Sequence, residues 1–167
     1  MQRLIVDGYN VLHAHPRYEI LADRDLDSAR AKLVEDVASF AVGRFRATVV
    51  FDAAANAAST GEPHHVANVA VVFSPAGMDA DSVIESLAYR ARERGESAVV
   101  VTSDGETQRL VAALGSARMS SPEFIAELDA SAEDLTAHSS AGSTRGRVEE
   151  RIPSDVREKL FRWARGR

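Results

Sequence analysis

The sequence predicts an α/β fold in which helices flank a central, mostly parallel sheet. Three observations lead to this prediction. Short apolar runs rich in β-branched residues alternate along the chain with amphipathic segments of helical period. These runs are almost continuously apolar, as strands buried on both faces must be. Several of the runs end in an aspartate, and in parallel sheets ligands bind beyond the carboxyl ends of the strands.

The predicted elements follow one another in a regular order. Short apolar runs predict strands over residues 2–6, 47–51, 69–73, 97–102 and 117–119. Apolar residues at helical spacing predict helices over residues 27–43, 81–94 and 106–114, and one from Ser121-Pro122-Glu123 to about Leu128 or beyond. For the first helix we expect Asp27 or Ser28 as the cap and Gly43 at the end. Residues 53–65 are mostly small and polar and predict a loop.

The chain divides into one domain and a basic tail. A length of 167 residues suits a single domain that can fold without disulfides. We place this domain at residues 1–135. Residues 136–147 are small, polar and basic, which predicts a flexible linker over residues 136–150. Residues 151–167 predict a C-terminal amphipathic basic helix.

Charge is distributed unevenly along the chain, whose net charge is −5. Residues 1–140 hold 12 Lys/Arg and 21 Asp/Glu, whereas residues 141–167 hold 8 and 4. An acidic body with a basic tail is consistent with a metal-binding core and a phosphate-binding arm. On charge alone, a solvated acidic surface and a solvated helix are the preferred interpretation. The absence of cysteine excludes disulfides and thiolate metal sites, so any metal ligand is an oxygen or an imidazole.

The N-terminal segment lacks the features of a targeting signal. The apolar stretch before Asp7 is too short for a signal peptide, and no apolar run is long enough to span a bilayer. We therefore expect a cytoplasmic protein with no membrane partner.

Acidic side chains gather where strands are predicted to end. Asp7, Asp52 and Asp104 each follow a strand, and Asp79 and Asp81 stand at the start of the helix after the third strand. Each one alone is explained by the turn and helix-cap chemistry that is common for aspartate. Together, five carboxylates on one edge of a parallel sheet favour a site.

Such a group of carboxylates indicates divalent metal chemistry. Neighbouring carboxylates repel one another unless a cation neutralises them. Mg²⁺ prefers oxygen ligands and is usually held by a few carboxylates, waters and substrate phosphates. One or two such ions can activate water and stabilise the charge that develops during phosphodiester hydrolysis. Mg²⁺ or Mn²⁺ is therefore the expected cofactor.

Taken in order, these segments resemble a known family. The stretch Asp7-Gly8-Tyr9-Asn10 after LIV resembles the opening motif of NYN-domain proteins of the YacP-like type, within the PIN-like nuclease group. VVFDA (49–53), ADSVIESLA (80–88) and VVTSD (100–104) resemble the later motifs, and IPSDVREKLFRWARG resembles the closing segment. The resemblance covers nearly the whole chain. It implies a three-layer PIN-like fold with a C-terminal helix.

The resemblance also implies a metal-dependent endoribonuclease. It makes Asp7, Asp81 and Asp104 the catalytic metal ligands, with Asp52 as an additional member. Asn10 would orient a water or the first turn. Flap endonucleases show the same order of motifs, and that analogy would add Asp79 as a ligand, although Asp81 is preferred. The family includes ribosome-associated endoribonucleases that cleave mRNA, which makes mRNA and the ribosome implied partners.

Basic side chains of the tail are the predicted RNA contacts. These are Arg145, Arg147, Arg151, Lys159 and Arg162. Solvated arginines without a ligand would show the same pattern.

Two other functions stay open on the sequence. A ribosome- or RNA-binding module with little catalysis of its own is compatible with the acidic body and basic tail. A phosphatase for small phosphate esters could use a strand-end aspartate as nucleophile. However, no aspartate stands two residues after Asp7, and no lysine closely follows the fourth strand.

Overall fold

A computed structural model describes residues 1–141. The remainder of the predicted linker, the predicted C-terminal helix and all five predicted RNA contacts of the tail lie outside the described residues.

Strands and helices alternate through most of the described chain. In order they are β1 (Gln2–Asp7), α1 (Gly8–His13), α2 (Pro16–Arg24), α3 (Leu26–Ala41), β2 (Phe45–Phe51), β3 (His64–Val66), β4 (Val69–Phe73), α4 (Ala80–Glu93), β5 (Ala98–Val101), α5 (Gly105–Ala113), β6 (Ala117–Met119) and α6 (Ser121–Ala141). Up to Ala141, no helix is both long enough and apolar enough to cross a membrane.

The strands of residues 1–141 form one six-stranded sheet in the order β3-β4-β2-β1-β5-β6. Every pairing is parallel except the one between β3 and β4. The central strand is β1, in which Leu4 lies opposite Ala47 of β2 and Val99 of β5. The prediction of a mostly parallel sheet is confirmed. The carboxyl ends of β1, β2, β4 and β5 therefore meet at one edge.

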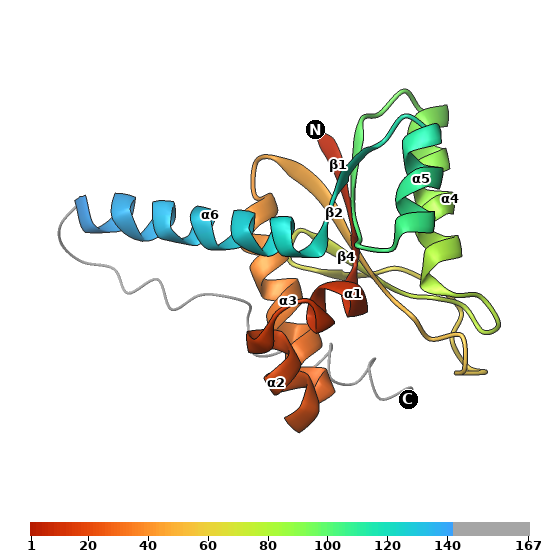
Figure 1. Cartoon of the computed structure of the whole chain (residues 1–167), viewed down its shortest axis with the longest axis horizontal. Coiled ribbons are helices and arrows are strands. Elements are labelled where there is room, and N and C mark those ends of the chain that lie inside the picture. The colour runs from red at the N-terminus through yellow and green to blue at the C-terminus, as the bar shows by residue number, and fades with distance from the viewer. Residues whose placement is uncertain (142–167) are drawn as a thin grey trace.

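Helices cover both faces of this sheet, as the three-layer prediction requires (Figure 1). Along β1, Leu4 and Val6 join a buried cluster with α1, α2, α3 and α6, whereas Ile5 joins a second cluster with α4 and α5. This alternation follows from the period of two along a strand. Because both faces are buried, the sheet is free to bind ligands mainly at its edges.

Two short helices between β1 and α3 were not predicted. With six and nine residues, α1 and α2 are too short for a clear helical period. The available signals were local: Asp7 caps α1, and α2 has a proline, Pro16, at its first position. The helix that follows starts earlier than predicted, because Asp25 caps it by accepting from the backbone N–H groups of Asp27 and Ser28.

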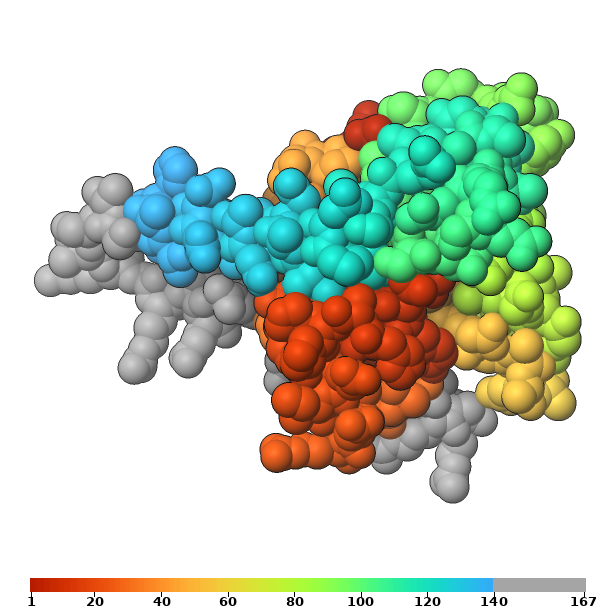
Figure 2. Space-filling view, viewed as in Figure 1, coloured from red at the N-terminus to blue at the C-terminus, as the bar shows by residue number. Residues whose placement is uncertain are grey.

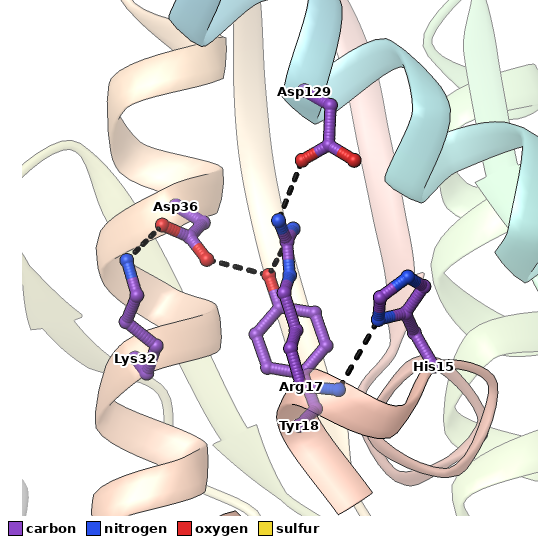
Figure 3. A network of polar contacts seen from close by, with 6 residues as sticks. All are labelled: His15, Arg17, Tyr18, Lys32, Asp36 and Asp129. Carbon is purple, nitrogen blue, oxygen red and sulfur yellow. Dashed lines mark hydrogen bonds and ion pairs between the residues drawn. The ribbon is translucent and has the colours of Figure 1, made fainter.

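A polar network joins α2, α3 and α6 (Figure 3). The buried Tyr18 donates its hydroxyl to Asp36 at 2.5 Å, and Lys32 pairs with the same carboxylate at 2.6 Å. Arg17 donates to the Tyr18 oxygen at 3.1 Å and pairs with Asp129 of α6 at 2.5 Å. These contacts fix the first half of α6 to the body.

The second half of α6 corrects the predicted linker boundary. Residues 136–141, which we assigned to the linker, are helical. Alanines favour the helix, and the Thr136 and Ser139 hydroxyls donate to backbone carbonyls one turn back. This part of α6, drawn in blue, projects from the rest of the described chain (Figure 2).

The predicted loop at residues 53–65 contains the start of β3. This strand pairs antiparallel with β4 through a tight turn at Ala67 and Asn68. The turn residue with positive φ is Ala67, at 51°, so the usual glycine signal of a hairpin was absent.

Candidate active site at the carboxyl edge of the sheet

All five aspartates singled out in the sequence lie at the carboxyl edge. Asp7 is the last residue of β1, Asp52 follows β2, and Asp104 stands three positions beyond β5. Asp79 and Asp81 flank the first residue of α4, which follows β4. Because β1 lies between β2 and β5, Asp7 is at the centre of the group.

Asp7 is buried, with 8% of its surface exposed. Its Oδ1 accepts from the Asn10 backbone N–H at 3.4 Å, and its Oδ2 accepts from the Thr102 hydroxyl at 3.1 Å. Burial raises the pKa of Asp7 to about 6, although both hydrogen bonds act to lower it. The charges of Asp81 and Asp104 contribute to the rise. A buried carboxylate among like charges is stabilised in its charged form by a cation.

The glycine after Asp7 allows the strand to turn directly into α1. A Cβ on Gly8 would overlap Cε1 of Phe51 and lie 2.9 Å from the Val50 carbonyl oxygen. Only a residue without a side chain lets the backbone approach β2 this closely. Gly8 therefore sets the position of Asp7 and Asn10 at the edge.

Asp104 caps α5 and is linked to Asp7 through Thr102. Its Oδ2 accepts from the Thr107 backbone N–H at 2.8 Å, and hydrogen bonds from Thr107 lower its pKa. The backbone N–H of Asp104 donates to the Thr102 hydroxyl oxygen at 3.1 Å. Since that hydroxyl donates to Asp7, one buried side chain positions both acidic residues.

Asp81 is the third carboxylate at this edge that interacts electrostatically with the others. Burial raises its pKa, and a hydrogen bond from the Thr107 side chain acts in the opposite direction. The charges of Asp104, Asp79 and Asp52 also raise the pKa of Asp81. Thr107 is 2% exposed, so a buried residue interacts with both Asp81 and Asp104.

Asp52 and Asp79 hold the start of α4. Asp52 accepts from the backbone N–H of Ala54 at 3.0 Å and from that of Ala80 at 3.2 Å. Asp79 is the N-cap of α4 and accepts from the Ser82 backbone N–H at 2.8 Å. Hydrogen bonds with Ser82 lower the pKa of Asp79. Both residues thus have a positioning task that Asp81 does not share.

Asn10 connects three elements at the edge. Its side-chain oxygen accepts from the Ser103 backbone N–H at 2.8 Å and from the Ser121 hydroxyl at 2.6 Å. Ser121 is fully buried at the start of α6, and its backbone N–H donates to the Ser103 hydroxyl at 3.0 Å. Asn10 therefore fixes the turn before Asp104, a role that differs from the two expected for it, the orientation of a water or of the first turn.

A cluster of aromatic side chains packs beside Gly8. The Tyr9 hydroxyl accepts hydrogen bonds from Arg30 of α3, whose guanidinium also pairs with Asp27 at 2.9 Å. The same guanidinium lies over the rings of Tyr9, Phe51 and Phe73, at 5.4 to 5.9 Å from their centroids. This packing holds the first turn of α1 against α3.

The donor set at this edge suits a hydrated hard cation. Within residues 1–141, no three His, Asp or Glu side chains lie close enough to enclose one metal ion. Mg²⁺ rarely needs such a cage, because it keeps several waters and takes one or two carboxylates together with substrate phosphates. The charges of Asp81 and Asp104 both act on Asp7, so one or two carboxylates at this edge are available to a hydrated ion.

Sequence reasoning missed the hydroxyl residues that position the aspartates. Thr102 and Ser103 stand directly before Asp104, so the polar end of the apolar run was the available signal. Ser121 was recognised only as a helix start, because its partner Asn10 is 111 positions away. No sequence signal connected Thr107 with Asp81.

Comparisons with known proteins show the family to which the chain belongs. Residues 4–165 match the profile of a family described as YacP-like NYN domain. The chain is 30% identical over 131 residues to the uncharacterised protein YacP of Bacillus subtilis (strain 168), covering 77% of this chain and 76% of that protein.

Two solved structures of Rae1 (YacP) from Bacillus subtilis share the fold. The structure of a tryptophan-to-leucine mutant superposes with a TM-score of 0.74 at 26% identity, covering 98% of this chain and 99% of that one. A second structure gives a TM-score of 0.67 at 27% identity, covering 83% and 79%. The NYN family is consistent with nuclease activity, and nucleases of the NYN and PIN-like group generally depend on divalent metal.

Proposed function

Because the chain belongs to the YacP-like NYN domain family, we propose that it is a metal-dependent endoribonuclease that hydrolyses phosphodiester bonds in RNA. Asp7, Asp81 and Asp104 are the proposed metal ligands, and Mg²⁺ or Mn²⁺ is the proposed cofactor. One observation supports this most strongly: Asp7 is buried, and Asp81 and Asp104 are near enough for their charges to raise its pKa. Structural carboxylates are normally paired with cations, so such a group favours a functional site.

When bound at this edge, the metal would supply an activated water and would stabilise charge on the reacting phosphate. The chain's own residues provide a fixed frame for that chemistry. Thr102 holds the Asp7 carboxylate and the backbone of Asp104, and Thr107 interacts with Asp81 and Asp104. Preorganised ligands of this kind need little rearrangement during the reaction.

Asp52, Asp79 and Asn10 have positioning roles in this proposal. Asp52 and Asp79 fix the first turn of α4 and hence Asp81. Asn10 fixes the turn that carries Asp104. Each of them lies beside the proposed ligands, and Asp52 and Asp79 add negative charge near Asp81.

The proposed substrate is mRNA, and the ribosome is a proposed partner. Both come from the resemblance stated above, whereas the cytoplasmic location comes from the apolar pattern of the sequence, and all three stay predictions. Products with a 5′-phosphate follow by analogy with the same group of nucleases.

The test uses wild type and Asp81→Asn with labelled mRNA, naked and in translation complexes. Each reaction contains Mg²⁺, Mn²⁺ or a chelator. We expect cuts that need metal and disappear in the variant, and the two substrates show whether the ribosome is required. Retained cleavage by folded Asp81→Asn would contradict the assignment of the site. No cleavage of either substrate by folded, metal-supplied wild type would favour an RNA-binding module.

A further inference from the structure

A shallow groove lies between α4 and α5. It measures about 450 Å³, which is within the size range of small-ligand sites. Ser82, Glu85, Ser86 and Tyr89 line it from α4, and Leu110 and Ala113 line it from α5. Tyr89 and Leu110 are 52% and 42% exposed, so both side chains are accessible to a ligand in the groove. The groove thus combines an apolar floor with hydroxyl groups and one carboxylate.

The groove is continuous with the carboxyl edge of the sheet. On α4, Glu85 stands one helical turn after Asp81, and the charges of Asp81 and Asp79 act on it. Tyr89 stands two turns after Asp81, about 12 Å along the helix axis. Both helices begin at the edge that holds the aspartates and run away from it side by side (Figure 1). A strand of RNA at that edge would reach the groove within a few nucleotides.

The side chain of Arg109 places a positive charge where the groove meets the carboxyl edge. Arg109 is exposed, and a Cβ on Gly105 would lie 3.8 Å from its Nη2, so the guanidinium turns toward the start of α5. Its charge lowers the pKa of Asp104. Among residues 1–141, no carboxylate lies within ion-pair distance of Arg109. Arg109 and the groove residue Ala113 are four positions apart on one face of α5.

We propose that this groove is a nucleotide subsite for single-stranded RNA, in which Tyr89 stacks on a base and Arg109 binds a neighbouring phosphate. Glu85 would accept a hydrogen bond from an exocyclic amino group of the base. The inference rests on the proposed function, since it concerns the RNA segment beside the bond to be cut. Arg109 and the continuity with the aspartates favour RNA over an apolar peptide.

Binding to two single-stranded probes of equal length tests the proposal with the full chain. One probe is labelled oligoadenylate, and the other is a labelled ribose-phosphate chain without bases. Fluorescence anisotropy is measured with Ca²⁺ in place of Mg²⁺ and Mn²⁺, so that a divalent cation can neutralise the aspartates, and only time points at which gel electrophoresis shows intact probe are used. The variants are Tyr89→Ala, Tyr89→Phe and Arg109→Gln. Leu135→Ala is the control, because Leu135 is an equally exposed apolar residue on α6.

The two parts of the subsite should respond differently. Tyr89→Ala should weaken binding of oligoadenylate about tenfold, the usual effect of removing one base–aromatic stack, while Tyr89→Phe and Leu135→Ala stay near wild type. Neither Tyr89 variant should change binding of the chain without bases. Arg109→Gln should weaken binding of both probes and reduce the slope of log K against log salt concentration by about 0.7.

Three results would overturn the subsite: no binding of oligoadenylate by wild type, unchanged binding by Tyr89→Ala, or equal loss on both probes. A groove that serves a protein partner would give the second result. Cleavage by wild type and Asp81→Asn, measured in parallel, separates this failure from failure of the nuclease. Cleavage without a Tyr89 effect refutes only the subsite, whereas a base-specific Tyr89 effect without cleavage supports the subsite and refutes only the nuclease.

Discussion

The two edges of the sheet hold charged residues in opposite ways. At the amino edge, Arg3 of β1 lies opposite Arg46 of β2, and both are close to Glu96, which precedes β5. Arg3 forms an ion pair with Glu96, and that hydrogen bond lowers the pKa of the carboxyl group. The charges of Arg46 and Arg94 act in the same direction. Each charge at this edge therefore has an opposite charge nearby.

The carboxyl edge has the reverse arrangement. The charges of Asp81 and Asp104 raise the pKa of Asp7, and the charge of Asp104 raises that of Asp81. The arginine whose charge acts on Asp104, Arg109, stands at the margin on α5. At the amino edge a carboxylate lies among arginines, whereas the carboxylates of the carboxyl edge lie among one another, an arrangement that favours a bound cation. The comparison shows that the two edges differ in the sign pattern of their charges.

The largest expected effect comes from removing one charge at the carboxyl edge. Asp81→Asn should lower kcat/KM for RNA by about a thousandfold, or about 4 kcal/mol in the barrier, because a proposed metal ligand is lost. Asp79→Asn should stay within about threefold of wild type, since asparagine is an equally good N-cap. Steady-state kinetics with labelled RNA distinguish them. Equal losses in both variants would show that the edge acts through its total charge.

Gly8→Ala should disrupt the carboxyl edge through packing. The added Cβ would overlap the Phe51 ring, so we expect a loss of about 3 kcal/mol in the free energy of unfolding. Gly105→Ala is the matched control, because Gly105 also follows a strand-end aspartate and its Cβ would meet only Arg109 at 3.8 Å. Urea denaturation measures both. A Gly8→Ala variant as stable as Gly105→Ala would refute the close approach.

The pKa of Asp7 predicts a stability that changes with pH. The value in the folded protein, about 6, lies above the ordinary 3.8, so the folded state binds this proton more tightly than the unfolded chain does. The resulting stabilisation is complete below pH 3.8 and is lost as the pH rises through about 6. Without metal, wild type should lose up to about 3 kcal/mol relative to Asp7→Asn between acidic and neutral pH.

Denaturation at several pH values, with and without Mg²⁺, measures this difference. Saturating Mg²⁺ should restore about 2.7 kcal/mol to wild type at about a hundred times its dissociation constant. Asp7→Asn should gain much less. If the free energy of unfolding changed with pH in the same way in wild type and Asp7→Asn, the raised pKa of Asp7 would be refuted.

The smallest effect is expected at the amino edge. Arg3→Ala removes the ion pair with Glu96, which is partly exposed and therefore contributes little to stability. Cleavage should be unchanged, and the melting temperature should fall only slightly in a thermal scan. A large loss of cleavage would mean that the two edges are coupled through β1.

The sequence predicted the fold class, most of the strands and the positions of the five aspartates. These features depend on local patterns, such as apolar runs and the polar residue at the end of each run. The family and the fold are confirmed by the profile match and by the two solved structures. The assignment of individual ligands stays a prediction.

What the sequence could not predict depends on contacts between distant residues. The difference between Asp79 and Asp81 arises because Asp79 accepts from Ser82, while Asp81 is partly buried near Thr107. The role of Ser121 depends on Asn10, and the Tyr9–Arg30 contact joins residues 21 positions apart. The apolar periodicity within one segment does not show which residues of distant segments will be in contact.

The bonds of Asn10 also determine when the carboxyl edge can form. Asp7 and Asn10 are translated before their partners Thr102, Ser103 and Ser121, which follow 95, 93 and 111 residues later. At roughly 5–20 residues per second, a ribosome needs roughly 5–20 seconds to add them. A nascent chain therefore has an incomplete edge during that interval. If the protein cuts RNA, its own message is protected from the growing chain during that interval.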